Sequence, residues 1–202
     1  MKPEYWDKAR RSLARRDPVM GAIIRAHPKV FMVRRGEAFM TLARAICGQQ
    51  ISVKAAQAVW NRLVTCCCEI TPEGVLARKR TELRACGLSD RKTEYIADLA
   101  QHFADGKIHE HRWPQMSDEE IIAELVDVRG IGRWTAEMFL MFNLLRPDVF
   151  PLDDLGLQKA IRRSYKKTAV KTMKKLGESW RPWRSVATWY LWRSLDPIPV
   201  EY

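Results

Sequence analysis

The stretch VRGIGRWTAEMF, residues 128–139, decides how the fold is interpreted. Gly130 and Gly132 enclose one apolar residue, and a helical pattern begins directly after them. Glycine accepts positive φ and leaves backbone N–H groups uncovered. The start of a helix attracts anions through its dipole and its N–H groups. The stretch therefore predicts a helix–hairpin–helix unit that holds a phosphate group at Gly130, Gly132 and the first helical residues, Arg133 and Thr135.

The same turn has a simpler interpretation. Tight turns favour glycine in any case, so a plain helical hairpin without a ligand fits the pattern as well as a phosphate site does. If the turn does hold phosphate, its carbonyl groups can also coordinate a monovalent cation that bridges to the phosphate.

Helical periodicity dominates the rest of the chain, and strand signals are scarce. Four apolar residues follow the i, i+3, i+4, i+7 spacing of one helical face: Phe39, Leu42, Ala43 and Ile46. Three helix starts are marked by Ser52, by Thr71-Pro72, and by the capping box of Ser117 and Glu120. The sequence therefore predicts an all-α fold, with later helices over about residues 133–145, 155–165, 170–179 and 183–195.

The charge of the chain is strongly positive. Its 35 Lys and Arg residues exceed its 24 Asp and Glu residues, which gives a formal charge of +11. The excess lies at the chain ends: residues 1–50 carry +7, 51–100 carry +2, 101–150 carry −4 and 151–202 carry +6. Such an imbalance attracts polyanions, nucleic acid first and anionic membrane second. A run of charges is also typical of an ordinary solvated face.

Other sequence features exclude several classes of protein. No apolar run approaches the ~20 residues of a membrane span. Residues 1–17 lack the apolar centre of a signal peptide, and Glu4 and Asp7 favour a structural helix over a basic targeting segment. The five cysteines, three of them contiguous at residues 66–68, lack the spacing of a zinc site or a disulfide framework. We expect a cytoplasmic protein without a metal site, and no membrane partner.

Two adjacent carboxylates, Asp153 and Asp154, stand at a predicted helix start twenty residues beyond Trp134. In one interpretation, either aspartate simply caps that helix. In the other, one of them faces a binding site, where an anion stabilises positive charge on a sugar as a base departs and orients a water molecule. The second arrangement is the logic of glycosidic bond cleavage.

Four motifs in order resemble one known family. They are Ile46-Cys47-Gly48-Gln49-Gln50-Ile51-Ser52, Gly130-Ile131-Gly132-Arg133-Trp134-Thr135-Ala136, Asp148-Val149-Phe150 with Asp153-Asp154, and Arg181-Pro182-Trp183-Arg184-Ser185 leading to Trp192. Together they are similar to the helix–hairpin–helix/Gly-Pro-Asp superfamily of DNA glycosylases, in particular its alkylation-repair branch, the 3-methyladenine DNA glycosylase II type. The resemblance covers most of residues 38–195.

The resemblance implies two helical subdomains with a cleft between them. Residues 38–147 would form a helical barrel that contains the hairpin, and residues 1–37 with 148–202 a second helical domain. The 202 residues leave no room for the extra β-rich domain of larger bacterial members, which implies a compact form.

The resemblance also implies roles for individual residues. Asp154 would be the catalytic carboxylate and Asp153 the helix cap or a supporting group. Gln50, with Ile51 beside it, would fill the space that a flipped nucleotide leaves. Aromatic residues Trp134 and Trp192 would line the base pocket with Met138, since an indole face attracts a cationic alkylated purine.

Trp134 stands where relatives that also nick DNA carry a nucleophilic lysine. The resemblance therefore implies a monofunctional enzyme that hydrolyses the N-glycosidic bond of alkylated purines in double-stranded DNA and has no lyase activity. With no cysteine beyond Cys86, it implies no iron–sulfur cluster and no other cofactor. We expect a monomer that works at the nucleoid of a bacterium or in a eukaryotic nucleus. The alternatives are a glycosylase for deaminated or oxidised bases and a non-catalytic DNA-binding protein.

Overall fold

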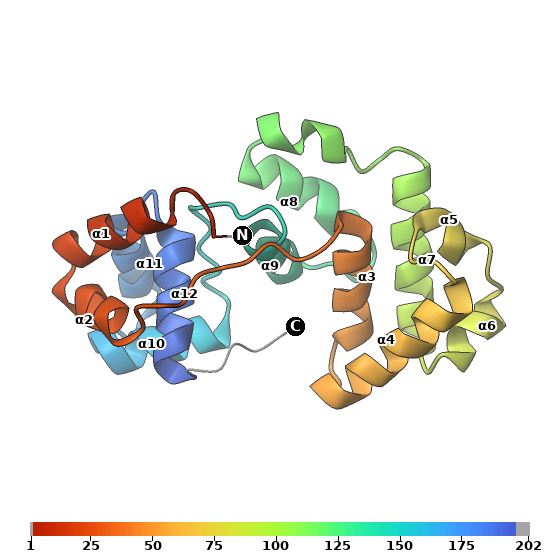
Figure 1. The fold of residues 1–202 in the computed structure, drawn as a ribbon, viewed down its shortest axis with the longest axis horizontal. Coiled ribbons are helices and arrows are strands. Elements are labelled where there is room, and N and C mark those ends of the chain that lie inside the picture. The colour runs from red at the N-terminus through yellow and green to blue at the C-terminus, as the bar shows by residue number, and fades with distance from the viewer. Residues whose placement is uncertain (1, 197–202) are drawn as a thin grey trace. The chain divides into compact units, whose positions relative to one another are not determined.

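The computed structural model describes residues 2–196, and every regular element in this range is helical (Figure 1). The predicted all-α fold class is thereby confirmed. The described residues divide into two compact units, which are considered one at a time. Residues 35–139 form the hairpin unit, and residues 2–34 with 140–196 form the terminal unit. The end of the predicted second domain, residues 197–202, lies outside the described residues.

The hairpin unit contains seven complete elements and the first part of α9. They are α3 (Ala38–Gly48), α4 (Val53–Cys67), α5 (Pro72–Leu76), α6 (Arg80–Ala85), α7 (Asp90–Ala104), the 3₁₀ helix η1 (Glu110–Gln115), α8 (Asp118–Val126) and α9 (Arg133–Phe142). The division between the two units falls inside α9, after Phe139.

Side-chain caps begin these helices where the sequence predicts them. Ser52 accepts a hydrogen bond from the N–H of Ala55 at 3.3 Å, and Thr71 caps α5 through the N–H of Gly74 at 3.0 Å. Ser117 and Glu120 form the predicted capping box of α8. The three predicted helix starts are therefore confirmed, because each cap satisfies a backbone donor that the helix itself leaves over.

The core of the hairpin unit is aromatic at two points. Phe39 of α3 meets Phe103 of α7 edge to face, with ring centroids 5.3 Å apart. Trp113 packs in the same way on Phe139 of α9 at 5.3 Å and donates its indole N–H to Glu124 of α8 at 2.8 Å. These contacts fix α8 and α9, the two arms of the hairpin, against the rest of the unit.

The terminal unit joins both ends of the chain. Its helices are α1 (Trp6–Arg16), α2 (Pro18–Ala26), α10 (Leu155–Tyr165), α11 (Val170–Ser179) and α12 (Arg184–Leu195), and Figure 1 shows the red α1 and α2 beside the blue α12. Asp17 caps α2 and also accepts hydrogen bonds from the hydroxyl of Tyr165 at 2.8 Å and the indole N–H of Trp180 at 2.9 Å. One carboxylate thus ties segments about 150 residues apart, 148 for Tyr165 and 163 for Trp180.

One predicted boundary differs from the structure. Helix α9 ends at Phe142, three residues before the predicted end at Leu145. Leu145 has a φ of 53°, and the N–H of Arg146 returns to the carbonyl of Leu140 at 2.9 Å. Pro147 follows, and a helix does not continue into the residues before a proline. None of the helices in residues 2–196 is long and apolar enough to cross a membrane.

Candidate functional site

The two glycines of the hairpin turn do different work. Gly130 has a φ of +84°, and a Cβ atom there would overlap the ring of Tyr95. The backbone at Gly132 is not in the positive-φ region, and a Cβ atom added there would meet no heavy atom within 4 Å. Positive φ therefore explains the glycine at position 130 but not the glycine at position 132. Its missing side chain instead leaves open space at the start of α9.

The turn is held in place from three sides. The N–H of Arg129 donates to the carboxylate of Asp98 at 2.8 Å, and the amide of Gln49 donates to the carbonyl of Gly130 at 2.8 Å. Ile131 is buried. The first turn of any α-helix has N–H groups that no carbonyl of the same helix accepts, and in α9 this turn begins directly after Gly132. The hairpin therefore presents a rigid, open helix start.

Arg133, predicted to contact the DNA backbone, also has partners within the protein. Its guanidinium makes two hydrogen bonds to Glu119 of α8, at 2.9 and 2.5 Å, and one to Glu137 at 3.2 Å. The Glu119 hydrogen bonds raise the pKa of Arg133, and the same contact lowers the pKa of Glu119. This side chain fastens the two arms of the hairpin, and its contact with DNA stays a prediction.

Helix α9 carries two of the predicted pocket residues on one face. Trp134 and Met138 are four residues apart, so their side chains are neighbours on the helix. Trp134 is 38% exposed and Met138 is half-buried, whereas Ala136 and Leu140 on the other side are fully buried. A tryptophan in the first turn of a helix with this much exposed area is not consumed by core packing.

The turn between α3 and α4 carries the predicted wedge residues. Gln50 is exposed with a φ of 57°, a left-handed conformation that is unfavourable for a residue with a side chain, and Ile51 is 40% exposed. The turn is supported by the Gln49 bond to Gly130 and by the ammonium group of Lys92, which donates to the carbonyl of Cys47 at 2.8 Å. Burial lowers the pKa of Lys92.

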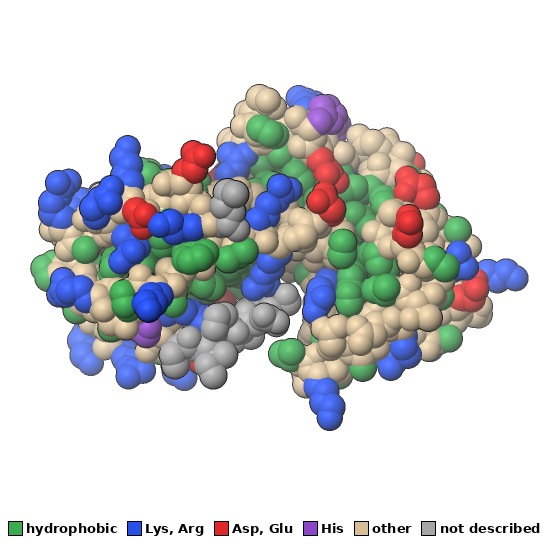
Figure 2. Space-filling model, in the orientation of Figure 1, with side chains coloured by type: hydrophobic (Ala, Val, Ile, Leu, Met, Phe, Trp, Pro, Cys, Tyr) green, Lys and Arg blue, Asp and Glu red, His purple; other side chains and the backbone are tan. Residues whose placement is uncertain are grey.

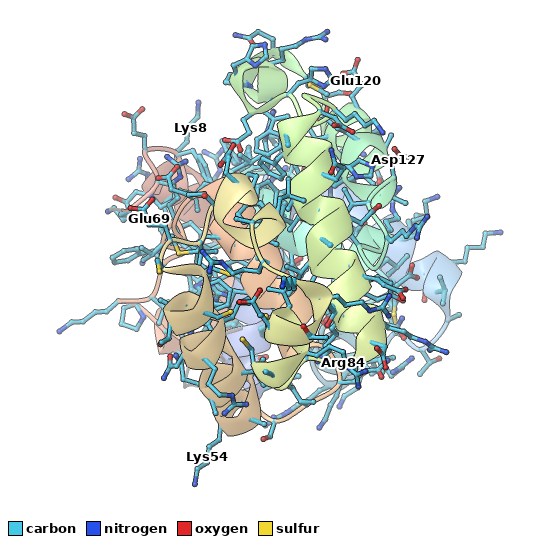
Figure 3. All side chains as sticks on the ribbon, turned by 90° about the vertical axis from the view of Figure 1, so that its right-hand side faces the viewer. Lys8, Lys54, Glu69, Arg84, Glu120 and Asp127 are labelled. Carbon is cyan, nitrogen blue, oxygen red and sulfur yellow. The ribbon has the colours of Figure 1, made fainter. Side chains whose placement is uncertain are left out.

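The surroundings of this turn are exposed. Lys54, two residues beyond the Ser52 cap, points away from α4 into solvent (Figure 3). The turn between α3 and α4, called the wedge turn below, is joined to the hairpin turn by the hydrogen bond from Gln49 to Gly130. These two residues are 81 positions apart in the sequence. Sequence patterns gave no signal for this hydrogen bond, because Gln49 and Gly130 lie in separate motifs and come together only when the chain folds.

Asp154 is the N-cap of α10. Its Oδ1 atom accepts hydrogen bonds from the N–H of Leu157 at 2.6 Å and from the indole N–H of Trp192 at 2.9 Å. A Cβ atom at Gly156 would come within 3.1 Å of that oxygen and 3.4 Å of the indole nitrogen, so glycine leaves the carboxylate room. Of the two aspartates that the sequence offers as the cap, Asp154 makes the capping bond and Asp153 is exposed, so Asp153 is not the cap that the resemblance offered as one of its two roles.

Trp192 is fixed at both its edge and its face. Besides the bond to Asp154, its ring stacks on Phe142 with centroids 6.0 Å apart and an interplanar angle of 20°. Phe142 meets Trp189 edge to face at 5.8 Å. The terminal unit therefore holds a half-exposed indole against a carboxylate at a helix N-terminus. The hydrogen bond from Trp192 to Asp154 is a relation that the sequence did not reveal.

The Arg181–Ser185 motif supports the loop that leads to Asp154. Arg184 donates to the carboxylate of Asp148 at 2.8 Å and to its backbone carbonyl at 2.7 Å. The hydroxyl of Ser185 donates to the carbonyl of Arg146 at 2.6 Å and accepts from the N–H of Val149 at 2.9 Å. These bonds anchor the loop at the start of α12, so the motif positions the aspartate from a distance of about thirty residues in the chain.

The remaining candidate ligands are His, Cys, Asp and Glu side chains. Within residues 2–196, no group of three or more His, Cys, Asp or Glu side chains is arranged to hold a metal ion. Cys47, Cys67 and Cys86 are buried free thiols, and burial raises the pKa of Cys67 and of Cys86 to about 11. Such thiols are protonated at neutral pH and are weak nucleophiles.

Comparisons with known proteins agree with these features. A putative DNA-3-methyladenine glycosylase of Bacillus subtilis, YfjP, is 34% identical over 188 residues, which are 88% of this chain and 66% of that protein. The crystal structure of a DNA-3-methyladenine glycosidase from Bacillus halodurans has a TM-score of 0.86 at 31% identity and covers 91% of this chain and 87% of its own. The 3-methyladenine DNA glycosylase Mag1 of Schizosaccharomyces pombe, solved in complex with abasic DNA, has a TM-score of 0.78 at 30% identity, with coverages of 96% and 100%.

A family model described as HhH-GPD superfamily base excision DNA repair protein matches residues 43–184. This range includes the wedge turn, the hairpin, Asp154 and the loop that supports it. The chain therefore belongs to the HhH-GPD superfamily of base excision DNA repair proteins.

Proposed function

We propose that this chain is a monofunctional DNA glycosylase that excises alkylated purines of the 3-methyladenine type from double-stranded DNA. The observation that carries the proposal is the carboxylate of Asp154, held by a backbone N–H and an indole N–H at the start of α10. Relatives named as 3-methyladenine glycosylases support the choice of substrate class. The matched region spans 66% of the Bacillus subtilis relative, so the activity of that whole protein is proposed for this chain and not taken over from it.

The reaction is hydrolysis of the bond between C1′ of the deoxyribose and the purine nitrogen. As the bond lengthens, positive charge grows on the sugar, and the anionic Asp154 stabilises it. The electrons of the broken bond leave with the base, which neutralises the cationic purine. A water molecule adds its oxygen to C1′ and releases its proton to solvent. Because an alkylated base already carries positive charge, it departs without a dedicated general acid.

The base itself would be held by aromatic side chains. Trp134 and Trp192 offer indole faces, which attract a cationic ring by roughly 1–2 kcal/mol when desolvated. Met138 lies beside Trp134 on α9 and offers a polarizable, adaptable contact. A target base must leave the duplex to be reached, and Gln50 with Ile51 would fill the space that it vacates. The strained backbone at Gln50 supports this role, since such strain clusters at functional sites.

The hairpin would hold the DNA backbone at Gly130, Gly132, Arg133 and Thr135. The open space at Gly132 supports a close approach by a phosphate group. A monovalent cation bound to the carbonyls of the turn would bridge to the same phosphate. No nucleophilic lysine follows the hairpin, since Trp134 occupies that position. Water would therefore be the nucleophile, with an abasic site as the product.

The protein would act as a monomer at the chromosome. Every proposed contact comes from one copy of the chain, so a second copy is not required. A substrate of damaged double-stranded DNA places the enzyme in the cytoplasm at the nucleoid in a bacterium, or in the nucleus in a eukaryote.

Asp154→Asn tests the mechanism without removing the helix cap. Asparagine caps helices about as well as aspartate, so the variant changes the charge and keeps the hydrogen-bond geometry. We expect the single-turnover rate of 3-methyladenine release from methylated DNA to fall at least ~100-fold, the scale of a lost electrostatic group in an active site. The matched control is Asp153→Asn, at the exposed neighbouring carboxylate, which should excise at the wild-type rate.

The alternatives predict other outcomes in the same assay. A non-catalytic DNA-binding protein fits the capping role of Asp154, and it would bind DNA without releasing any base. A glycosylase for deaminated or oxidised bases would act on other members of a panel of lesion-containing duplexes. Strand scission without alkali, or borohydride trapping of a covalent complex, would contradict the monofunctional assignment. Excision by Asp154→Asn at the wild-type rate would refute the proposed chemistry.

A further inference from the structure

Basic side chains cover the exposed sides of α10 and α11 in the terminal unit. Residues 155–177 contain eight Lys and Arg residues and no Asp or Glu. All eight are exposed, whereas Leu157, Ala160 and Ile161 of α10 are fully buried. We define the basic face by these eight: Lys159, Arg162, Arg163, Lys166, Lys167, Lys171, Lys174 and Lys175.

Helix geometry aligns these charges. Residues 159, 162 and 163 follow the i, i+3, i+4 spacing, so they form one stripe on the side of α10 opposite its buried residues. In α11, residues 171, 174 and 175 repeat the spacing, and Met173 and Gly177 are buried. Residues 166 and 167 lie in the connection between the two helices.

The basic face is not neutralised by the protein. The carboxylates nearest to it in sequence are Asp153 and Asp154 before α10 and Glu178 after Gly177; Asp154 accepts hydrogen bonds from Leu157 and Trp192, and Glu178 pairs with Arg181 and Arg184. Arg162 bonds to the neutral amide of Gln158, and Arg163 to a backbone carbonyl. Among the ion pairs that the structure shows for residues 2–196, none includes a member of the basic face. Glu178 also interacts electrostatically with Lys174, but the eight like charges exceed this one counter-charge and repel one another, so an external anion stabilises them.

We propose that the basic face binds the sugar–phosphate backbone of double-stranded DNA beyond the target nucleotide, an inference that rests on the proposed function. Charge complementarity selects the occupant, since a duplex presents one phosphate charge every ~1.7 Å of its axis. Asp154 caps α10, and the eleven residues of α10 span about 16 Å. That length equals about five base pairs of flanking DNA. The face therefore lies within reach of the same duplex that places its damaged nucleotide at Asp154.

The test measures the salt dependence of binding to undamaged DNA. We compare the wild type with the triple variant Lys171→Gln, Lys174→Gln, Lys175→Gln, titrating a labelled duplex of about two helical turns between ~50 and ~200 mM salt. Each lost phosphate contact lowers the slope of log K against log salt by about 0.9. We expect the slope of the variant to be smaller by about 2 to 3, with at least a tenfold weaker complex at the lowest salt.

The matched control removes the same charge from the hairpin unit. Lys79→Gln, Arg91→Gln and Lys107→Gln are exposed positions outside the hairpin and the wedge turn. This variant should keep the wild-type slope within about 0.5, because no lost contact means no lost counterion release. Equal slopes for the two triple variants would overturn the proposal, because the effect would then reflect net charge alone. A second variant, Lys166→Gln with Lys167→Gln, should lower the slope by about 1 to 2.

Two further measurements distinguish this proposal from the proposed glycosylase function and from membrane binding. Undamaged DNA needs no excision, so failure of the wild type to release 3-methyladenine would refute the proposed function and leave the slope test valid. Co-sedimentation with phosphatidylserine vesicles examines the other anionic surface. If the triple variant lost vesicle binding and kept wild-type DNA binding, the basic face would be assigned to membranes and the proposal would be wrong.

Discussion

The two units of this protein differ in their net charge and in the structural features that they offer to a polyanion. The terminal unit holds 21 Lys and Arg residues against 8 Asp and Glu, a formal charge of +13. The hairpin unit holds 14 against 15, a formal charge of −1, although it contains the motif that is expected to hold phosphate. Figure 2 shows the same contrast, with blue side chains over the terminal unit and red side chains interspersed over the hairpin unit.

This contrast indicates two ways of attracting a polyanion. In the hairpin unit, a backbone turn and a helix start offer N–H groups at short range, and a glycine keeps the approach open. In the terminal unit, side-chain charges act at long range and are screened by salt within about 10 Å at 0.1 M. The comparison therefore predicts that changes in the hairpin unit alter fixed geometry, and that changes in the terminal unit alter charge or the junction of the chain ends.

The largest stability effect is expected at that junction. Asp17→Ala removes the cap of α2 and leaves the hydroxyl of Tyr165 and the indole N–H of Trp180 without their acceptor. A lost cap costs about 1 kcal/mol, and each orphaned buried donor about 1–3 kcal/mol. Thermal or urea unfolding should show a loss of about 3–7 kcal/mol.

Asp153→Ala serves as the control for this loss, because Asp153 is exposed and caps no helix. It should change stability by less than about 0.5 kcal/mol. An Asp17→Ala protein as stable as the wild type would show that the chain ends are joined by packing alone.

The next largest effects are expected at the two glycines of the hairpin, where the same substitution by alanine should have different consequences. Gly130→Ala should destabilise the hairpin unit by about 1–3 kcal/mol, because alanine is strained at a φ of +84° and its Cβ overlaps Tyr95. Gly132→Ala should leave stability within about 0.5 kcal/mol and weaken DNA binding about tenfold, since its methyl group enters the open space where a phosphate would lie.

Unfolding curves measure the stability of both glycine variants, and DNA titrations measure their affinity. We expect Gly130→Ala to lose stability, and Gly132→Ala to keep its stability and lose affinity. If Gly132→Ala bound DNA as tightly as the wild type, the hairpin would not bind the phosphate backbone of DNA. The interpretation as a plain helical hairpin would then be correct.

The smallest effect is expected at the link between the hairpin and wedge turns. Gln49→Ala removes a single, partly exposed hydrogen bond to Gly130, which is worth about 1 kcal/mol. Excision of 3-methyladenine from duplex DNA should fall about fivefold, because the left-handed turn at Gln50 loses support.

A single-stranded substrate is the control for Gln49→Ala, since no duplex has to be opened and the wedge is not needed. Excision from it should match the wild type. An equal loss on both substrates would show that Gln49 acts on the stability of the unit and not on the wedge.

Local sequence patterns predicted much of this structure. Ser52, Thr71 and Ser117 cap helices as expected, because a cap depends on a side chain and a backbone N–H three residues away. The all-α class and the family are likewise confirmed. The end of α9 was misplaced, because apolar periodicity continues to Leu145 and conceals the left-handed turn there.

The candidate site was only partly accessible to such patterns. Asp153 and Asp154 are both good capping residues, so their sequence left the cap open between them, and only the structure shows that Asp154 makes it. The bond from Trp192 to Asp154 joins residues 38 positions apart, and that from Gln49 to Gly130 joins residues 81 apart. Pairings of this kind depend on how the helices pack, and a single sequence carries no record of that packing.

The sequence by itself determined the helices, their caps and the glycine turn, because these depend on residues a few positions apart, and four motifs in order along the chain indicated the superfamily. Only the tertiary structure decided that Asp154 is both cap and partner of Trp192 and that Gly132 opens a space. These features arise where distant segments meet, since folding brings both ends of the chain into the terminal unit.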